Sequence, residues 1–200
     1  MSKAYLLTWN PKKWDFPEGF DCFRNRVIND GYYEMDWAAI NTSIQVGDEL
    51  FLMRLGDNPR GIVAKGIATS TVHSGKHFVK EEADVGRTSQ YVFMRVVAVG
   101  DISNGEYLSW DTLKTTFPSQ NWTPQGSGIA IKDEYHTRLN QMWGTLFERS
   151  SINDPMPPFD INLTDNGIVQ FICGRCKNQF NEAPRCPECG QLVKEAGLRL

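Results

Sequence analysis

The sequence predicts an α+β protein in which a few helices pack on a curved antiparallel sheet or small barrel, followed by a small zinc ribbon. Three observations predict this class. Two apolar runs, Glu49–Leu55 and Ile62–Ala68, flank the turn-forming residues Gly56–Pro59, as expected of adjacent strands that are covered on both faces. The predicted strands and helices do not alternate as they do around a parallel sheet. Four of the five cysteines lie between residues 173 and 189.

The other elements of the main domain follow from apolar spacing and from turn residues. Phe20, Phe23 and Val27 share one face of a short helix, and Tyr135 and Leu139 begin the apolar stripe of a longer one. Before the central hairpin, the predicted order is a strand over Ala4–Thr8, a helix over Pro17–Asn29, and a loop or short strand over Gly31–Asp36. After the hairpin come a polar loop over Ser70–Thr88, a strand over Gln90–Val99 and a short helix over Ser109–Thr116. A loop feeding a short strand over Asn121–Lys132 and a closing helix over Asp133–Arg149 complete the domain.

Composition divides the chain into two parts. The 200 residues, 40% of them apolar, suffice for one packed domain and a small appendage. A stretch rich in Pro, Asn, Asp and Ser, including Pro155, Pro157 and Pro158, has the composition of a linker. We therefore expect a main domain over residues 1–148, a linker over residues 149–167 and a metal module over residues 168–200.

The net charge and the hydropathy exclude several classes of protein. A net charge of −3 argues against a general nucleic-acid polycation but leaves room for a local basic surface. No apolar run reaches the roughly 18 residues that a membrane span requires, and the N-terminus does not have the pattern of a signal peptide. We expect a cytoplasmic protein whose cysteines are reduced.

The cysteine pattern predicts a metal site. Cys173 and Cys176 form one CxxC pair, and Cys186 and Cys189 form a second pair after a gap of nine residues. Four thiolates suit one tetrahedral Zn²⁺ and leave no coordination position for substrate, so we expect a structural zinc. A redox CxxC and a rubredoxin-like iron are the alternatives. Cys22 stands apart from both pairs and is expected to be a packed or surface thiol.

Three stretches of the main domain carry a family resemblance. They are LLTWNPKKWDF near the start, SIQVGDELFLMRLG followed by PRGIVAKG, and NWTPQGSGIAI. In this order and spacing they resemble the EVE domain, a member of the PUA-like superfold that is related to the YTH readers of methylated adenine. The similarity covers residues 4–147 and is closest to EVE domains fused to HNH nucleases in modification-dependent restriction. It implies a PUA-like fold and a pocket that holds a modified cytosine flipped out of DNA.

A base reader needs aromatic faces together with a few polar groups. Extruding a base costs a few kcal/mol, which stacking on aromatic side chains recovers. Of the six tryptophans, four fall at predicted element ends or in loops: Trp9, Trp14, Trp37 and Trp122. The resemblance implies Trp37 and Trp122 as pocket walls, flanked by Trp9 and Asn10. The polar candidates beside them are Asn41, Thr42, Gln125 and Ser127, with Gly126 and Gly128 allowing close backbone approach.

Each of these assignments has a structural alternative. Tryptophan is usually a core residue, and we assign Trp110 and Trp143 to packing. Lys12 and Lys13 follow the first tryptophan and are candidate phosphate contacts, and Arg54 is a candidate contact to the base or a phosphate. Other basic residues either add to such a patch or form an ordinary solvated surface: Arg60, Lys65, Lys76, Lys80 and Arg87.

Three functions are compatible with the sequence. The first is a non-enzymatic reader of DNA carrying 5-methyl- or 5-hydroxymethylcytosine in a restriction or defence setting, with a nuclease as a separate partner. The second is a reader of modified RNA. The third is an enzyme, although the sequence has no HNH constellation, P-loop or G-x-S-x-G motif. We expect nucleic acid as the partner and no membrane.

Overall fold

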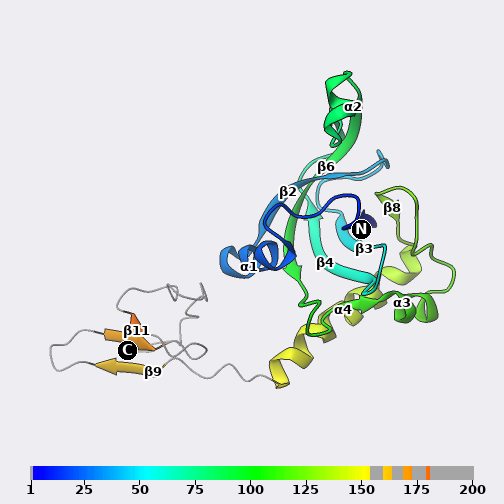
Figure 1. Ribbon diagram of the computed structural model, residues 1–200. Coiled ribbons are helices and arrows are strands. Elements are labelled where there is room, and N and C mark those ends of the chain that lie inside the picture. The colour runs from blue at the N-terminus through cyan, green and yellow to red at the C-terminus, as the bar shows by residue number, and fades with distance from the viewer. Residues whose placement is uncertain (1, 154–159, 164–168, 173–178, 181–200) are drawn as a thin grey trace. The chain divides into compact units, whose positions relative to one another are not determined.

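The computed structural model of the protein describes residues 2–153, 160–163, 169–172 and 179–180 (Figure 1). The chain forms two compact units, Met1–Phe147 and Glu148–Leu200. The first unit contains a sheet with the strand order β2-β6-β4-β3-β1-β8, in which β5 also pairs with β6 and β7 with β4. Its strands are β1 (Ala4–Trp9), β2 (Tyr33–Ala38), β3 (Glu49–Arg54), β4 (Gly61–Ala68), β5 (His73–Lys76), β6 (Thr88–Val99), β7 (Leu108–Ser109) and β8 (Ile129–Ala130).

The central hairpin is confirmed. β3 and β4 pair antiparallel, with Glu49 opposite Ile67 and Arg54 opposite Gly61. The prediction of an entirely antiparallel sheet is wrong at one place, because β1 and β3 run parallel. Parallel neighbours require a long crossover connection, and here the crossover contains helix α1 (Phe20–Asp30) and strand β2.

The sheet curls until its two edge strands approach each other. After β2, the Ala39 N–H donates to the Gln90 carbonyl at 2.9 Å, and the Ile40 N–H donates to the Ser127 carbonyl at 2.9 Å. Ser127 lies just before β8, the strand at the opposite edge. The strand pairing is not closed, but this contact gives the sheet a barrel-like curvature (Figure 1).

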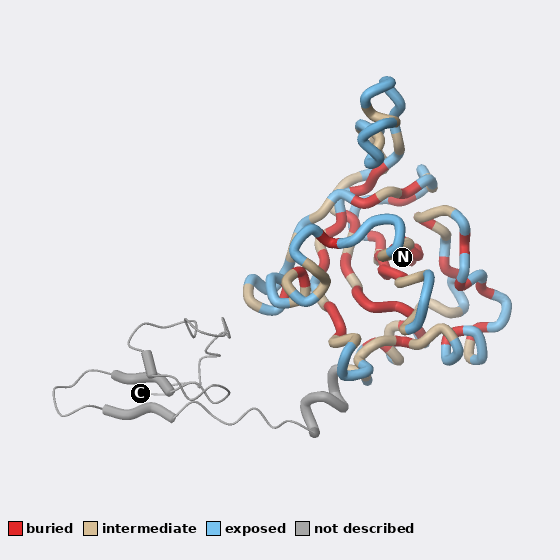
Figure 2. Tube along the Cα trace, viewed as in Figure 1, coloured by how far each residue is buried: buried red, intermediate tan, exposed pale blue. Residues whose placement is uncertain are grey.

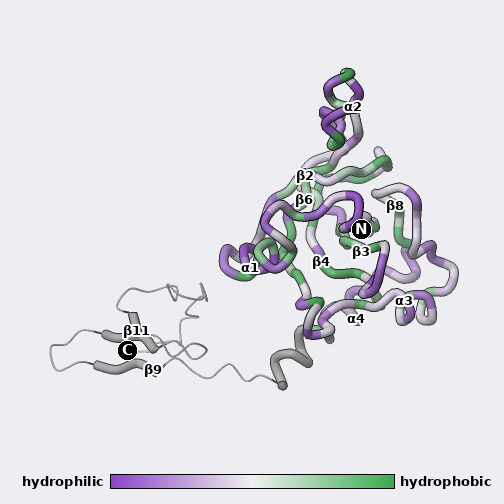
Figure 3. The backbone as a smooth tube through the Cα atoms, viewed as in Figure 1, coloured by the Kyte–Doolittle hydropathy of each residue, from purple (hydrophilic) through white to green (hydrophobic). Residues whose placement is uncertain are grey.

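Both faces of the central strands are buried, as predicted. Side chains alternate between the two faces of a strand, so Tyr5 and Leu7 of β1 join one apolar core while Ala4 and Leu6 join another. The first core is completed by α1 and the loop before it, and the second by helices α3 (Trp110–Thr116) and α4 (Asp133–Asn153). Buried, apolar chain follows β3 and β4 in Figures 2 and 3.

Several segments differ from the prediction. Residues Ser70–Thr88 are not simply a polar loop, since they contain β5 and helix α2 (Lys80–Asp84). Helix α2 has no buried residue, so the sequence has no apolar periodicity there that would reveal a helix. The predicted linker also contains regular structure, namely the end of α4 and strand β9 (Asp160–Leu163).

Part of the second unit is described. Strands β9, β10 (Val169–Ile172) and β11 (Gln179–Phe180) form an antiparallel sheet in the order β11-β10-β9. The four cysteines of the predicted zinc ribbon lie outside the described residues.

A polar cluster joins α4 to the sheet. One oxygen of Glu49, Oε2, lies 2.7 Å from His136 Nε2 and 2.6 Å from Asn140 Nδ2, and the other, Oε1, lies 3.1 Å from Lys65 Nζ. Partial burial acts to raise the pKa of the Glu49 carboxyl, but the bonds from Asn140 and His136 and the charge of Lys65 hold it below its ordinary value. The folded state therefore favours the ionised carboxylate.

This cluster predicts an acid-sensitive contribution to stability. A carboxyl whose pKa is depressed by folding stabilises the protein above its unfolded pKa, roughly 4.3, and this contribution disappears as the pH falls through the folded pKa. We expect Glu49→Gln to lower the free energy of unfolding by about 1–2 kcal/mol at pH 7 and by much less at pH 3. Denaturant unfolding at both pH values measures this, with the exposed Glu81→Gln as the control. An equal loss at both pH values would contradict the assignment.

Candidate nucleic-acid interface

Three segments far apart in sequence meet at the carboxyl end of β1. The Thr8 N–H donates to Ser127 Oγ at 3.1 Å, and the Trp37 indole N–H donates to the Thr8 carbonyl at 3.2 Å. The bond from Ile40 to the Ser127 carbonyl completes the contact. The structure thus brings together Trp9–Asn10, Trp37 and Gln125–Gly128, which sequence reasoning had grouped as one site.

Glycine is required where the loop before β8 passes the end of β2. Gly128 has φ +88°, and a Cβ there would lie 3.2 Å from the Cβ of Ala39. A Cβ on Gly126 would lie 2.7 Å from the Ile40 side chain. Because neither glycine has a side chain, the loop can run directly beside the residues that follow Trp37. The Gln125 side chain in this loop is exposed.

Trp9 and Trp37 are core residues whose rings are already covered. They are 4% and 8% exposed. Trp9 stacks on Phe20 with ring centroids 5.1 Å apart, and Trp37 stacks on Phe16 at 6.0 Å. The chain's own phenylalanines therefore occupy faces on which an extruded base would have to stack.

Trp122 lies in a different part of the molecule. It is 3% exposed, its indole N–H donates to the Phe117 carbonyl at 3.1 Å, and it belongs to the second core, whereas Trp9 and Trp37 belong to the first. The prediction that Trp9, Trp37 and Trp122 line one concave pocket is therefore wrong. Trp122 lies in the turn after α3 and packs against the end of that helix. The sequence does not reveal which face of the sheet this turn covers.

Trp14 is the exposed tryptophan of the segment that follows β1. Its exposed fraction is 39%, and its ring meets that of Trp37 edge to face, with centroids 5.3 Å apart. Its backbone is fixed on both sides, because its N–H donates to the Asn10 carbonyl and its carbonyl accepts from the Trp9 indole at 3.0 Å. Sequence reasoning noted Trp14 only as a loop tryptophan, and no periodicity separates it from its buried neighbours.

The predicted cations at this edge have different partners. Lys12 forms an ion pair with Asp57 at 2.6 Å, and its hydrogen bond and charge hold the pKa of Asp57 below the usual range. Arg54 donates to the carbonyls of Asp57 and Pro59, and its guanidinium lies 5.7 Å from the Trp9 ring. Arg54 thus braces the 55–60 loop. Lys13 is exposed and makes no ion pair within the described residues.

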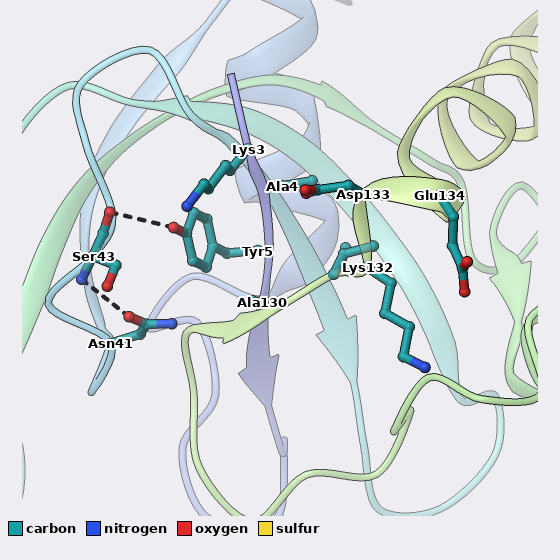
Figure 4. Close-up of a pocket in the computed structure, with 10 residues that line it drawn as sticks. Lys3, Ala4, Tyr5, Asn41, Ser43, Ala130, Lys132, Asp133 and Glu134 are labelled. Carbon is teal, nitrogen blue, oxygen red and sulfur yellow. Dashed lines mark hydrogen bonds between the residues drawn. The ribbon is translucent and has the colours of Figure 1, made fainter. Parts of the chain in front are cut away.

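An open hollow of about 620 Å³ lies beside the start of β1, and no tryptophan is among the residues that line it (Figure 4). Its lining carries both charge signs, from Lys3 and Lys132 on one hand and Asp133 and Glu134 on the other. Tyr5 donates from its hydroxyl to the Ser43 carbonyl at 3.3 Å. Burial, with the charges of Asp48 and Asp133, raises the pKa of that hydroxyl.

Two negative findings apply to the part of the chain that the structure describes. No group of three or more His, Cys, Asp or Glu residues gathers there in a way that would hold a metal ion. No helix in the same residues combines the length and the apolar character that crossing a bilayer demands.

Comparison with known proteins identifies the fold. No family model matches the chain, and no curated protein matches it in sequence. The human THYN1 protein, solved in complex with DNA containing 5-methylcytosine, is 12% identical, with a TM-score of 0.50 over 71% of this chain and 98% of that one. A hypothetical protein from Leishmania major is also similar, with 13% identity and a TM-score of 0.47 over 72% of this chain and 96% of that one. So is the protein PSPTO5229 from Pseudomonas syringae, with 12% identity and a TM-score of 0.47 over 70% of this chain and 99% of that one. The first unit has a PUA-like fold.

Proposed function

We propose that the protein is a non-enzymatic reader of modified nucleic acid, foremost of double-stranded DNA that carries 5-methyl- or 5-hydroxymethylcytosine. The observation that carries this proposal is the exposed Trp14, which stands edge to face against Trp37 where β1 and β2 end. An exposed indole on a fixed backbone is a stacking platform, and each stacked base contributes about 1–3 kcal/mol. That range is comparable to the few kcal/mol that extruding a base costs.

Trp14 is the first contact in this proposal, and the buried rings support it. Trp9 holds the Trp14 backbone through its indole N–H, and Trp37 packs against the Trp14 ring. The faces of Trp9 and Trp37 become available only if Phe20 and Phe16 move away from them. We assign Trp122 to the second core and give it no contact with the base.

Polar groups at the same edge supply hydrogen bonds. Ser127 Oγ accepts from the Thr8 N–H and keeps its own proton to donate. Asn10 Oδ1 accepts from the Lys12 N–H, which leaves the Asn10 amide protons for a ligand. Gln125 is exposed and offers both a donor and an acceptor. These groups suit the Watson–Crick edge of an extruded base, and we assign the exposed Lys13 to a phosphate contact.

The fold supports the same class of ligand. The human THYN1 protein, which the first unit resembles in fold, was solved with DNA containing 5-methylcytosine. The restriction or defence setting and a separate nuclease partner rest on the resemblance to EVE domains fused to HNH nucleases. This chain has no recognisable nuclease motif of its own.

The zinc site is part of the proposal. We assign Cys173, Cys176, Cys186 and Cys189 to one structural Zn²⁺, because two CxxC pairs supply four thiolates and complete a tetrahedral shell. In so small a module the metal supplies much of the folding free energy, so its role here is to hold the tail folded.

Competition for a labelled, methylated duplex tests the proposed function. Unlabelled competitors of one sequence are the unmodified duplex, the 5-methyl- and 5-hydroxymethylcytosine duplexes, and the corresponding RNA with and without modified bases. We expect a modified DNA duplex to compete best. Stronger competition by modified RNA would assign the protein to RNA, and equal competition by all would contradict a reader. Cleavage of any of these with added Mg²⁺ or Mn²⁺ would show an enzyme.

A further inference from the structure

Two cations converge on one indole at the surface of the first unit. The guanidinium carbon of Arg60 lies 4.5 Å from the centroid of the Trp110 ring, and Lys114 Nζ lies 4.8 Å from it. We call Arg60, Trp110 and Lys114 the Trp110 cluster. Each cation is within the range of a cation–π interaction, so the cluster concentrates positive charge around one partly buried ring.

The backbone holds the cluster in this arrangement. The Trp110 N–H donates to the Arg60 carbonyl at 2.9 Å, which continues the pairing of β4 with β7 beyond Gly61 and Ser109. Lys114 follows Trp110 by four residues on α3 and therefore shares its helix face. Two independent constraints bring the cations together, and neither depends on a ligand.

Neither cation has a carboxylate partner. Within the described residues, no carboxylate oxygen lies within 4.0 Å of Arg60 or Lys114. Asp111, the acidic residue of α3, is exposed and forms no ion pair there, and Asp57 of the preceding loop is bound to Lys12. The two like charges over one ring repel each other, and an anion close to both would offset that repulsion.

Two other cations that lie over aromatic rings, Arg95 and Lys65, show the contrast. Arg95 lies 4.8 Å from the Tyr32 ring, and its guanidinium also donates twice to Glu34. Lys65 lies over Phe51 and pairs with Glu49 at 3.1 Å. In both cases a carboxylate neutralises the cation. The Trp110 cluster has the same aromatic support without the anion, which is the arrangement expected where the anion is a ligand.

We propose that Arg60 and Lys114 bind a phosphate group, and that its source is the backbone of the nucleic acid held by the proposed reader site. Arginine suits this ligand because its planar fork donates to two phosphate oxygens at once. The 55–60 loop connects the cluster to the reader site, since the Leu55 N–H donates to the Trp9 carbonyl at 2.7 Å and Asp57 pairs with Lys12. The inference rests on the proposed function for the identity of the polymer.

The dependence of DNA affinity on salt tests the inference. Each phosphate contact contributes about 0.9 to the slope of log K against log salt concentration on B-DNA. We expect Arg60→Gln and Lys114→Gln each to reduce that slope by about 0.9, equally on methylated and unmethylated duplexes, and Arg60→Lys to retain it. Over a fourfold range of salt concentration, the loss of one contact makes the change in affinity about 3.5-fold smaller.

Matched controls separate the cluster from general charge and from folding. Lys80→Gln removes an exposed lysine on α2, which Figure 1 shows on the opposite side of the first unit from α3, and should leave the slope unchanged. Unfolding midpoints of all variants report whether each is folded. Titration of the wild type with inorganic phosphate, followed through the Trp110 indole N–H by NMR, tests free phosphate as the source.

The outcomes distinguish this inference from the proposed function. An unchanged slope in both folded variants, Arg60→Gln and Lys114→Gln, while the wild type prefers methylated DNA, overturns the inference and leaves the reader intact. A reduced slope without any preference for methylated DNA supports the phosphate site and contradicts the reader. If the Trp110 signal responds to inorganic phosphate but the salt dependence of DNA binding is unchanged in the variants, the site binds free phosphate. That result would contradict the nucleic acid as the source of the phosphate.

Discussion

Replacing Cys186 by serine is expected to release the zinc ion and unfold the C-terminal module without lowering the stability of the first unit. Structural Zn²⁺ contributes apparent free energies of about 10–16 kcal/mol in small zinc-binding peptides, which is more than so short a stretch gains by apolar burial. The chain forms two compact units that divide between Phe147 and Glu148, so loss of the metal should affect the second. Elemental analysis and denaturant unfolding of the full chain measure both effects.

Cys22→Ser is the matched control for this variant. The Cys22 thiol lies 3.2 Å from a carboxylate oxygen of Glu18, and that hydrogen bond raises the pKa of the thiol, which disfavours the thiolate that a metal binds. We expect the control to keep one zinc ion per chain. Wild-type protein with neither zinc nor iron, and with all five thiols open to titration, would contradict the metal site.

The second large effect separates two tryptophans that touch each other. Trp37 is 8% exposed and packs inside the first core, so Trp37→Ala should cost about 3–5 kcal/mol of unfolding free energy. Trp14 is 39% exposed, so Trp14→Ala should change stability far less. If Trp14 stacks on the base, this variant should lose about 1–3 kcal/mol of binding to modified DNA. Thermal unfolding and DNA titration of both variants measure the difference.

Trp14→Phe is the control, because it keeps an aromatic face at the same position. It should retain most of the affinity that Trp14→Ala loses. A folded Trp14→Ala variant that binds methylated DNA as tightly as the wild type would remove Trp14 from the site. If Trp37→Ala alone loses binding, and only in proportion to its loss of folded protein, both tryptophans are packing residues.

The sequence was informative wherever burial leaves a pattern. The apolar runs on both sides of Gly56–Pro59 predict the β3–β4 hairpin, and both faces of these strands are in fact buried. The sequence does not predict β5 and α2, because these elements bury no side chain and their apolar residues therefore show no regular spacing. The parallel pairing of β1 with β3 was missed for a different reason, because an apolar strand does not specify the direction of its neighbour.

The structure brings together several segments of the predicted site, but it does not bring together the three tryptophans that were predicted to line it. The resemblance and the turn residues brought Trp9, Trp37 and Ser127 together, and the hydrogen bonds through Thr8 and Ile40 join them. Burial separates the tryptophans in a way that the sequence does not encode, because Trp14 and Trp122 both lie in loops. One is exposed beside Trp37, and the other seals the second core.

The dissociation constants of the wild-type protein for two duplexes that differ only in one cytosine C5-methyl group test the central claim most directly. A methyl group in a fitted pocket discriminates by about 1–3 kcal/mol. The account predicts that the methylated duplex, or its hydroxymethylated counterpart, binds at least roughly tenfold more tightly at one fixed salt concentration. Equal constants for the modified and unmodified duplexes would contradict the reader and leave a PUA-like domain that binds DNA, if at all, through its phosphates.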